Sequence, residues 1–486
     1  MAAKEFIVAI ELGSSKITGI AGKKNSDGSI QVLAVVREDA TSCIRKGVVF
    51  NIDKTSVCLT NIIKRLKTLL KSEISRVYVG MGGQSIRSIR NTIVKTLPED
   101  SVVTQDIINE LMDNNRSMQY PDLEILDAAT QEYKVGTQLL TDPVGVQCTK
   151  LEGNFLNILC RKAFFRNLNK CFENANITIA ELYLAPIALA HSVLTEVEKR
   201  TGSLLVDLGA DTTTVSVYHK NILRHLAVIP LGSNNVTKDL AAELQIEEKD
   251  AETMKLEYAQ AFTDTSEIEE DKRYRIDDER SVSQQKFVDI VEARVNEIIQ
   301  NVWYQVPDEY KDKLMGGIVL TGGGSNMKKI KEAFTNITKV GKYRIANTIT
   351  QNVTSTDKEV NARNGMMNTA LGLLAKGDLN CAGQPIRNDL FGETPTSTTS
   401  PDKPYLNLGE TKPGQVRTLE DRKALEEERR RKEEEARREE ERREEERRMQ
   451  REKENEGKGF LNKFKKSSKE FFSKLISEES TDDDTK

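Results

Sequence analysis

The sequence predicts an α/β protein of two or more lobes that ends in a long polar extension. Residues 1 to about 380 alternate short β-rich runs with longer amphipathic helical patterns, which is typical of layered α/β folds. A chain of 486 residues is too long for one simple core. Hydrophobic residues make up only 37% of the chain, and because the deficit falls mostly near the C-terminal end, the first part can still bury an ordinary core.

Composition and charge exclude several classes of protein. The net charge of -4 gives no overall field that would attract nucleic acid. The six cysteines form no CxxC pair, and the three histidines do not lie at metal-ligand spacing, so we expect reduced cytosolic thiols. We also expect no signal peptide and no membrane-spanning helix, because no apolar run approaches ~18 residues.

The first glycine turn closes a predicted hairpin. A strand at residues 7–12 is followed by a short turn and then directly by a second strand at 17–21. The turn consists of Gly13, Ser14, Ser15 and Lys16. A Walker loop would lead into a helix instead, whereas a tight hairpin turn presents backbone N–H groups and hydroxyls to an anion.

A second hairpin repeats this plan about two hundred residues later. Strands at 204–208 and 213–218 flank it, and its turn consists of Gly209, Ala210, Asp211 and Thr212. Each hairpin has a carboxylate just before its turn, Glu11 in the first and Asp207 in the second. We interpret the pair as an internal duplication whose two turns clamp a triphosphate, with both carboxylates holding a hydrated Mg²⁺ through its water.

A third turn follows a strand near residue 320. It contains Gly322, Gly323, Gly324 and Met327, and we expect a helix over 328–334. Glycines at a helix N-terminus let backbone approach a ligand closely, and the helix dipole favours phosphate. One such turn is equally consistent with plain structure, but three in this order and spacing are specific.

The three turns resemble the signature of the actin, hexokinase and heat-shock chaperone ATPases, and within it the FtsA family of actin-like bacterial cell-division proteins. The first ~380 residues carry this resemblance, notably at 142–145, 184–190, 229–237 and 251–255. It implies an actin-like two-lobed fold, ATP and Mg²⁺ as ligands, and a nucleotide contact at Gly232. It also implies that Glu252 and Lys255 face the ribose and base, although without the family they read as solvated helix residues.

The resemblance divides the chain into segments. Lobe 1 comprises 1–83, 162–201 and 362–383, with an inserted subdomain at 84–161. Lobe 2 comprises 202–238 and 306–361, with a smaller subdomain at 239–305. A flexible linker at 384–418, a charged single helix at 419–457, an amphipathic membrane helix at 458–476 and an acidic disordered tail at 477–486 follow.

Three departures from the superfamily pattern bear on catalysis. Ala210 and Asp211 replace two glycines of the usual Asp-x-Gly-Gly-Gly-Thr turn, and Glu11 replaces Asp. Ala185 precedes Pro186 where the chaperones have a Glu that orients the attacking water. We therefore expect ATP binding with slow hydrolysis, so that the nucleotide acts as a structural switch. A small-molecule kinase of the same superfamily is the alternative, but no catalytic base is evident.

The last seventy residues predict an unusual extension. Residues 419–456 contain 14 basic and 17 acidic residues, with Glu four positions before Arg in pairs such as Glu439 and Arg443. This favours a solvated single helix over a disordered polyampholyte. Beyond it, apolar residues recur at helical spacing among lysines, which predicts a helix lying in an anionic membrane interface rather than one packed on the globule. These residues are Phe460, Leu461, Lys463, Phe464, Lys466, Phe471, Phe472, Leu475 and Ile476.

The resemblance also implies partners. Residues 281–306 predict a long helix with one apolar face and with Arg294 on the other, and by resemblance this subdomain binds the acidic, apolar C-terminal peptide of FtsZ. The alternative is a surface arginine without a partner. Filament formation, contacts with other division proteins through the inserted subdomain, and a place at the cytoplasmic face of the cell membrane are further implied. A pilus-assembly relative would lack the lipid-seeking tail, and a shape-determining relative would lack the insertion.

Overall fold

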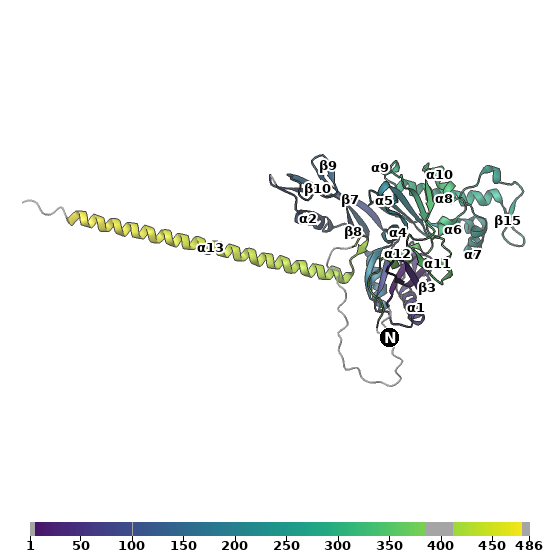
Figure 1. Cartoon of the computed structure of the whole chain (residues 1–486), viewed down its shortest axis with the longest axis horizontal. Coiled ribbons are helices and arrows are strands. Elements are labelled where there is room, and N and C mark those ends of the chain that lie inside the picture. The colour runs from purple at the N-terminus through teal and green to yellow at the C-terminus, as the bar shows by residue number, and fades with distance from the viewer. Residues whose placement is uncertain (1–4, 100, 384–411, 479–486) are drawn as a thin grey trace, which may run out of the picture. The chain divides into compact units, whose positions relative to one another are not determined.

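The computed structural model describes residues 5–99, 101–383 and 412–478 (Figure 1). The chain forms two compact units, residues 1–418 and residues 419–486. The first unit is built on two large mixed sheets, and the second is a single helix. The predicted α/β class is therefore confirmed.

The first large sheet belongs to lobe 1. In spatial order its described strands are β19 (Val353–Thr354), β3 (Ile30–Asp39), β2 (Lys16–Lys24), β1 (Ile7–Leu12), β6 (Val77–Met81), β11 (Ile179–Leu184) and β20 (Gln415–Val416). Its helices are α1 (Ile52–Leu70), α3 (Lys162–Asn174), α4 (Ala185–Val193) and α12 (Asn368–Lys376), whereas α5 (Glu196–Thr201) contacts the second sheet. The Asn51 side chain caps α1 by accepting from the Lys54 N–H, and α1 buries Leu59, Ile62 and Leu66.

The second sheet begins in lobe 2. In order its described strands are β18 (Tyr343–Ile345), β17 (Gly317–Thr321), β12 (Ser203–Leu208), β13 (Thr213–His219), β14 (Ile222–Ile229), β7 (Arg87–Thr96), β10 (Lys150–Arg161), β8 (Leu123–Val135) and β9 (Gln138–Leu140). The remaining helices of the first unit are α2 (Gln105–Arg116), α6 (Ser233–Leu244), α7 (Glu248–Tyr258), α8 (Gln284–Gln305), α9 (Asp308–Lys311), α10 (Ile330–Thr338) and α11 (Lys358–Asn361). The small strand pairs are β4 (Ile44–Arg45) with β5 (Val48–Val49) and β15 (Arg273–Arg275) with β16 (Ser281–Ser283).

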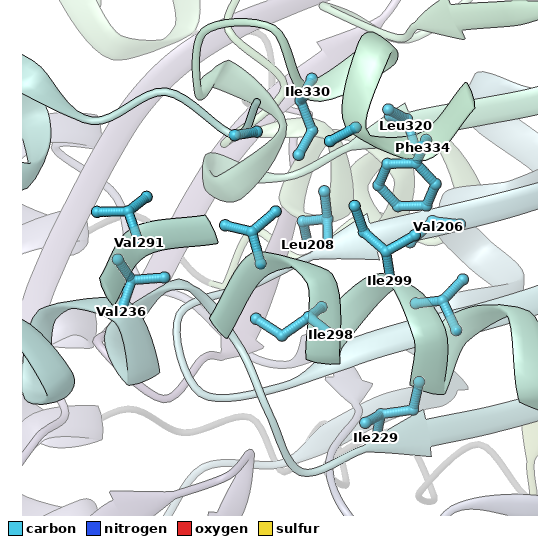
Figure 2. Packing of buried hydrophobic residues seen from close by; sticks show 14 of the residues in the cluster. Val206, Leu208, Ile229, Val236, Val291, Ile298, Ile299, Leu320, Ile330 and Phe334 are labelled. Atoms are coloured by element: carbon cyan, nitrogen blue, oxygen red, sulfur yellow. The ribbon is translucent and has the colours of Figure 1, made fainter. Parts of the chain in front are cut away.

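The core of lobe 2 lies between its sheet and helices α6, α8 and α10. Ile298 and Ile299 of α8 lie among Val206 and Leu208 of β12 and Phe334 of α10 (Figure 2). The predicted long helix with one apolar face is confirmed as α8, because all but one of the apolar residues expected on that face are buried. This core supports the β12–β13 hairpin from behind.

The inserted subdomain joins the sheet of lobe 2. Its strands β7, β10, β8 and β9 extend the lobe 2 sheet through one pairing, Ala227 of β14 with Arg87 of β7. The Leu226 N–H adds a 2.8 Å hydrogen bond to the Ser88 hydroxyl. Figure 1 shows α2 beside β7 and β10. The sequence predicts an inserted subdomain of lobe 1 here, and in the structure its strands pair with the lobe 2 sheet through that single residue pair.

Two features of the extension differ from the prediction. The end of the expected linker is not free, because Gln415 and Val416 form β20 on the edge of β11. The charged and amphipathic helices are one continuous helix, α13 (Leu419–Glu478). Within it Arg443 pairs with Glu439 at 2.8 Å, as expected from the spacing. Residues 479–486 of the expected acidic tail lie outside the described residues.

Across the described residues, no helix combines the length and the apolar character needed to cross a membrane.

Candidate functional site

The three glycine turns meet at one cavity of about 450 Å³ between the lobes. Its lining includes Glu11, Gly13, Ser14, Ser15, Lys16, Asp207, Gly209, Thr212, Glu252, Lys255, Gly322, Gly323, Gly324 and Met327. Every residue that the sequence proposed for nucleotide or metal therefore lies here, except Gly232. Residues from distant parts of the chain, Glu11 to Met327, converge because β1 and β12 end at the same cleft.

The two hairpins have the same turn geometry. The Gly13 N–H donates to the Lys16 carbonyl at 3.1 Å, and the Gly209 N–H donates to the Thr212 carbonyl at 2.9 Å. Strands β1 and β2 pair antiparallel in the first, as do β12 and β13 in the second. The matching geometry is consistent with an internal duplication, and each turn directs polar groups into the cavity.

Side chains and neighbouring loops brace the first turn. The buried Ser14 hydroxyl accepts from the Gly47 N–H at 2.8 Å, and the Lys16 ammonium pairs with Glu359 of α11 at 2.8 Å. Gly47 and Gly83 pack so closely that a Cβ on Gly47 would lie 2.5 Å from the Gly83 Cα. The glycine pair Gly82–Gly83 was visible in the sequence, but its contact with residue 47 is not local and had no sequence signal.

Helix α6 braces the second turn. The N–H groups of Ser233 and Asn234 donate to the carbonyls of Gly209 and Ala210 at 3.0 and 2.8 Å. Gly232 does not line the cavity. A Cβ on it would lie 2.4 Å from the Ala210 carbonyl oxygen, so its role is to let α6 approach the turn.

Glu11 and Asp207 lie together on the cavity floor. Burial, and then repulsion from Asp207, raises the pKa of Glu11 to about 7, although Lys16 opposes the shift. Burial raises the pKa of Asp207 to about 6. Neither carboxylate forms an ion pair with a side chain in the part of the chain that the structure describes. Two close carboxylates without a cation are chemically suited to a hydrated Mg²⁺.

The third turn differs from its prediction. The glycines enter a four-residue 3-10 turn, Gly323–Asn326, and α10 begins only at Ile330, so no α-helix N-terminus points at the cavity from here. Gly322 has a φ of +82° and a ψ of 171°, a region that is essentially reserved for glycine. A Cβ on it would lie 2.4 Å from a carboxylate oxygen of Asp207. The absence of a side chain at Gly322 therefore leaves room for that carboxylate.

Lys255 and Glu252 of α7 are not solvated helix residues. The Lys255 side chain is buried, and its ammonium contacts Glu252 at 2.6 Å, the Thr237 hydroxyl at 2.8 Å and the Ser233 carbonyl at 3.3 Å. These contacts join α7 to α6 at the cavity wall. Asn326, Lys328 and Met366 complete this side and were not singled out from the sequence.

Ala185 lies on the cavity wall next to Pro186 at the start of α4. Its methyl group can neither accept a proton nor orient a water. Among the described residues that line the cavity, Glu11, Asp207 and Glu252 are the carboxylates, and Glu252 is already paired with Lys255. The cavity can bind an anion and a cation, and Glu11 and Asp207 are its carboxylates without an ion pair among the described residues.

The residues expected to bind partners lie elsewhere. Arg294 of α8 is half-buried and makes two hydrogen bonds to Asp239 of α6, at 2.5 and 3.1 Å, and an ion pair with Glu297. It is thus held against α6 rather than free on the surface. The residues expected to contact membrane belong to α13 between 460 and 476, and their side chains lie outside the described part of the structure.

Comparison with known proteins identifies relatives over about two thirds of the chain. Residues 204–372 match the family model "Cell division protein FtsA", and residues 83–159 match "SHS2 domain inserted in FTSA". The cell division protein FtsA of Neisseria meningitidis serogroup B is 31% identical over 68% of this chain and 81% of its own length. That of Pseudomonas aeruginosa is 30% identical over 67% and 79%.

A solved structure supports the fold independently. A chain of the "PilM-PilN type IV pilus biogenesis complex" superposes with a TM-score of 0.54 over 76% of this chain and 97% of its own length, at 14% identity. At that identity the likeness concerns the fold alone. Taken with the paired hairpins, the inserted subdomain and the curated relatives, it shows that this chain has the actin-like fold and belongs to the FtsA family of cell-division proteins.

Proposed function

We propose that the cavity binds ATP together with Mg²⁺ and that the nucleotide acts mainly as a structural switch. The observation that carries the proposal is the convergence of two equivalent hairpin turns, with Glu11 and Asp207 between them. The N–H groups of the turns and Lys16 bind the phosphates, while Glu252 and Lys255 face the ribose and base. When bound, Mg²⁺ neutralises phosphate charge.

Hydrolysis in this site is slow. Phosphoryl transfer depends on positioning the attacking water, and the wall position suited to that task carries Ala185. Lys16 remains engaged with Glu359 in this structure, and a phosphate would compete for its ammonium. Binding of the triphosphate therefore loosens a tie between β2 and α11, which lets the nucleotide alter the relation of these two elements without turnover.

The cellular role is that of a self-associating scaffold in cell division. Family membership supports tethering of the FtsZ ring through its acidic C-terminal peptide, with Arg294 of α8 as the expected contact. It also supports recruitment of other division proteins through the inserted subdomain. The lysine-rich amphipathic end of α13 binds anionic lipid at the cytoplasmic face of the membrane. One such segment binds weakly, so stable attachment follows from several linked copies.

Sedimentation with anionic vesicles tests the membrane part of the proposal. The doubly substituted chain Phe464→Glu and Phe471→Glu loses apolar area and adds repulsion, so it should stay in the supernatant. The matched control, Phe464→Leu and Phe471→Leu, keeps an apolar side chain at both positions and should pellet like the parent chain. Equal pelleting of the Glu variant and its control would refute the membrane assignment.

A further inference from the structure

A short segment just before α13 is docked on the globular unit. Gln415 and Val416 pair antiparallel with Tyr183 and Leu182 of β11, which would otherwise be the edge of the lobe 1 sheet. Both residues are nearly inaccessible, at 3% and 1% exposure. The Lys412 N–H donates to the Gln415 side chain at 2.9 Å, and the Gln415 N–H returns a bond to the Lys412 carbonyl at 2.8 Å. We call residues 412–416 the strap.

Gly414 has a backbone angle and a close contact with α4 that require glycine. Its φ is +80°, and a Cβ would lie 2.6 Å from the Cγ2 of Ile187 on α4. Its carbonyl accepts from the Leu184 N–H at 2.7 Å, and its own N–H donates to the Asp127 carboxylate at 3.0 Å. Asp127 belongs to β8, so one glycine bridges lobe 1 and the inserted subdomain.

The strap also supplies a charge that the sheet edge requires. Glu181 of β11 is only 4% exposed, and one of its carboxylate oxygens accepts from the Tyr183 hydroxyl at 2.8 Å. The other lies 3.5 Å from the Lys412 ammonium, which also contacts Asp378 at 2.5 Å. Without the strap, a buried carboxylate would lose its cation and Asp127 would lose a donor. Buried charges without partners are costly, and an open sheet edge invites pairing with other chains.

We propose that the edge formed by β11 and Asp127 is a built binding site for the strap, and that its occupancy sets where the C-terminal tail leaves the globular unit. When the strap is docked, the tail leaves from β11. When it is released, the last held residue before the tail is Gly383, whose N–H donates to the Glu73 carbonyl at 2.8 Å. The reach of the tail then increases, and the inserted subdomain loses one tie to lobe 1. The consequence for membrane attachment rests on the proposed function, but the docking itself does not.

Hydrogen–deuterium exchange on the full chain tests the docking. Gly414→Val should make the Leu184 amide exchange at least tenfold faster, because the valine cannot adopt the backbone angle or fit against Ile187. Lys412→Gln should give a smaller increase. Lys23→Gln, which removes an exposed lysine from β2, is the matched control and should leave the Leu184 amide unchanged.

A peptide supplied in trans separates a built site from an incidental contact. Excess peptide of residues 410–418 should restore protection of the Leu184 amide in the Gly414→Val chain, and the same peptide carrying Gly414→Val should not. Unchanged exchange in the variant chain, or no rescue by the native peptide, would overturn the proposal. Neither readout involves ATP or lipid, so failure here is distinguishable from failure of the proposed function.

Discussion

Gly322→Ala should weaken magnesium-dependent ATP binding while the chain still folds. An alanine at φ +82° and ψ 171° costs on the order of 1–3 kcal/mol in backbone strain. Its Cβ would lie 2.4 Å from the Asp207 carboxylate, whereas real Cβ contacts essentially never fall below 3.0 Å, so the carboxylate must move by several tenths of an ångström. If the displaced Asp207 carboxylate loses one hydrogen bond to a water of the bound Mg²⁺, the cost is about 1.5–3 kcal/mol. This corresponds to roughly a ten- to hundredfold weaker affinity for Mg·ATP.

Titration calorimetry with Mg·ATP measures this change, and thermal unfolding shows whether the variant is folded. Gly341→Ala is the control, because Gly341 does not line the cavity and its Cβ would meet no atom within 4 Å. It should bind within a few-fold of the parent chain. Parental affinity in a folded Gly322→Ala chain would refute the role assigned to Asp207, and so would an equal loss in both variants.

Four further outcomes are expected. Lys255→Met should weaken ATP binding and lower the free energy of unfolding by about 1–2 kcal/mol, measured by calorimetry and denaturant titration. Phe334→Ala should cost about 3–5 kcal/mol of unfolding free energy, because this ring is fully buried. Arg294→Ala should weaken binding of an acidic FtsZ C-terminal peptide in an anisotropy titration, because it removes a cation from the polar face of α8. Burial, then Lys376, lowers the pKa of His191 to about 4. The unfolded chain binds this proton more tightly, so His191 should contribute a fall of up to about 2 kcal/mol in the free energy of unfolding between pH 6.5 and 4, measured as the difference between the parent chain and His191→Gln.

The cavity between the glycine turns was largely predictable because its signals are local. The pattern of strand, short glycine turn and returning strand predicts a hairpin. Both Gly13 and Gly209 lie in turns of this kind. The carboxylate that precedes each turn is likewise visible within a few residues. Because this pattern occurs twice in the sequence, it also predicts two turns that face each other.

The rest was hidden because it depends on contacts between distant segments. Gly47 packs on Gly83, but the two residues are far apart in sequence and no local pattern near either one indicates the contact. The strap contributes a strand of only two residues, which has no periodicity and lies in a region rich in turn-forming residues, so the sequence predicted a linker there. Charge pattern placed Arg294 on the polar face of its helix, but its partner Asp239 lies on another helix, 55 positions earlier.

The rate of ATP turnover at saturating Mg·ATP tests most directly whether the cleft binds nucleotide as a switch. It is best measured on the full chain with anionic vesicles present, alongside equilibrium binding. Because Ala185 offers no group to orient water, we predict saturable Mg·ATP binding with turnover far below the roughly 1–100 s⁻¹ of kinases. Turnover within that range would contradict the central claim, and so would the absence of saturable binding.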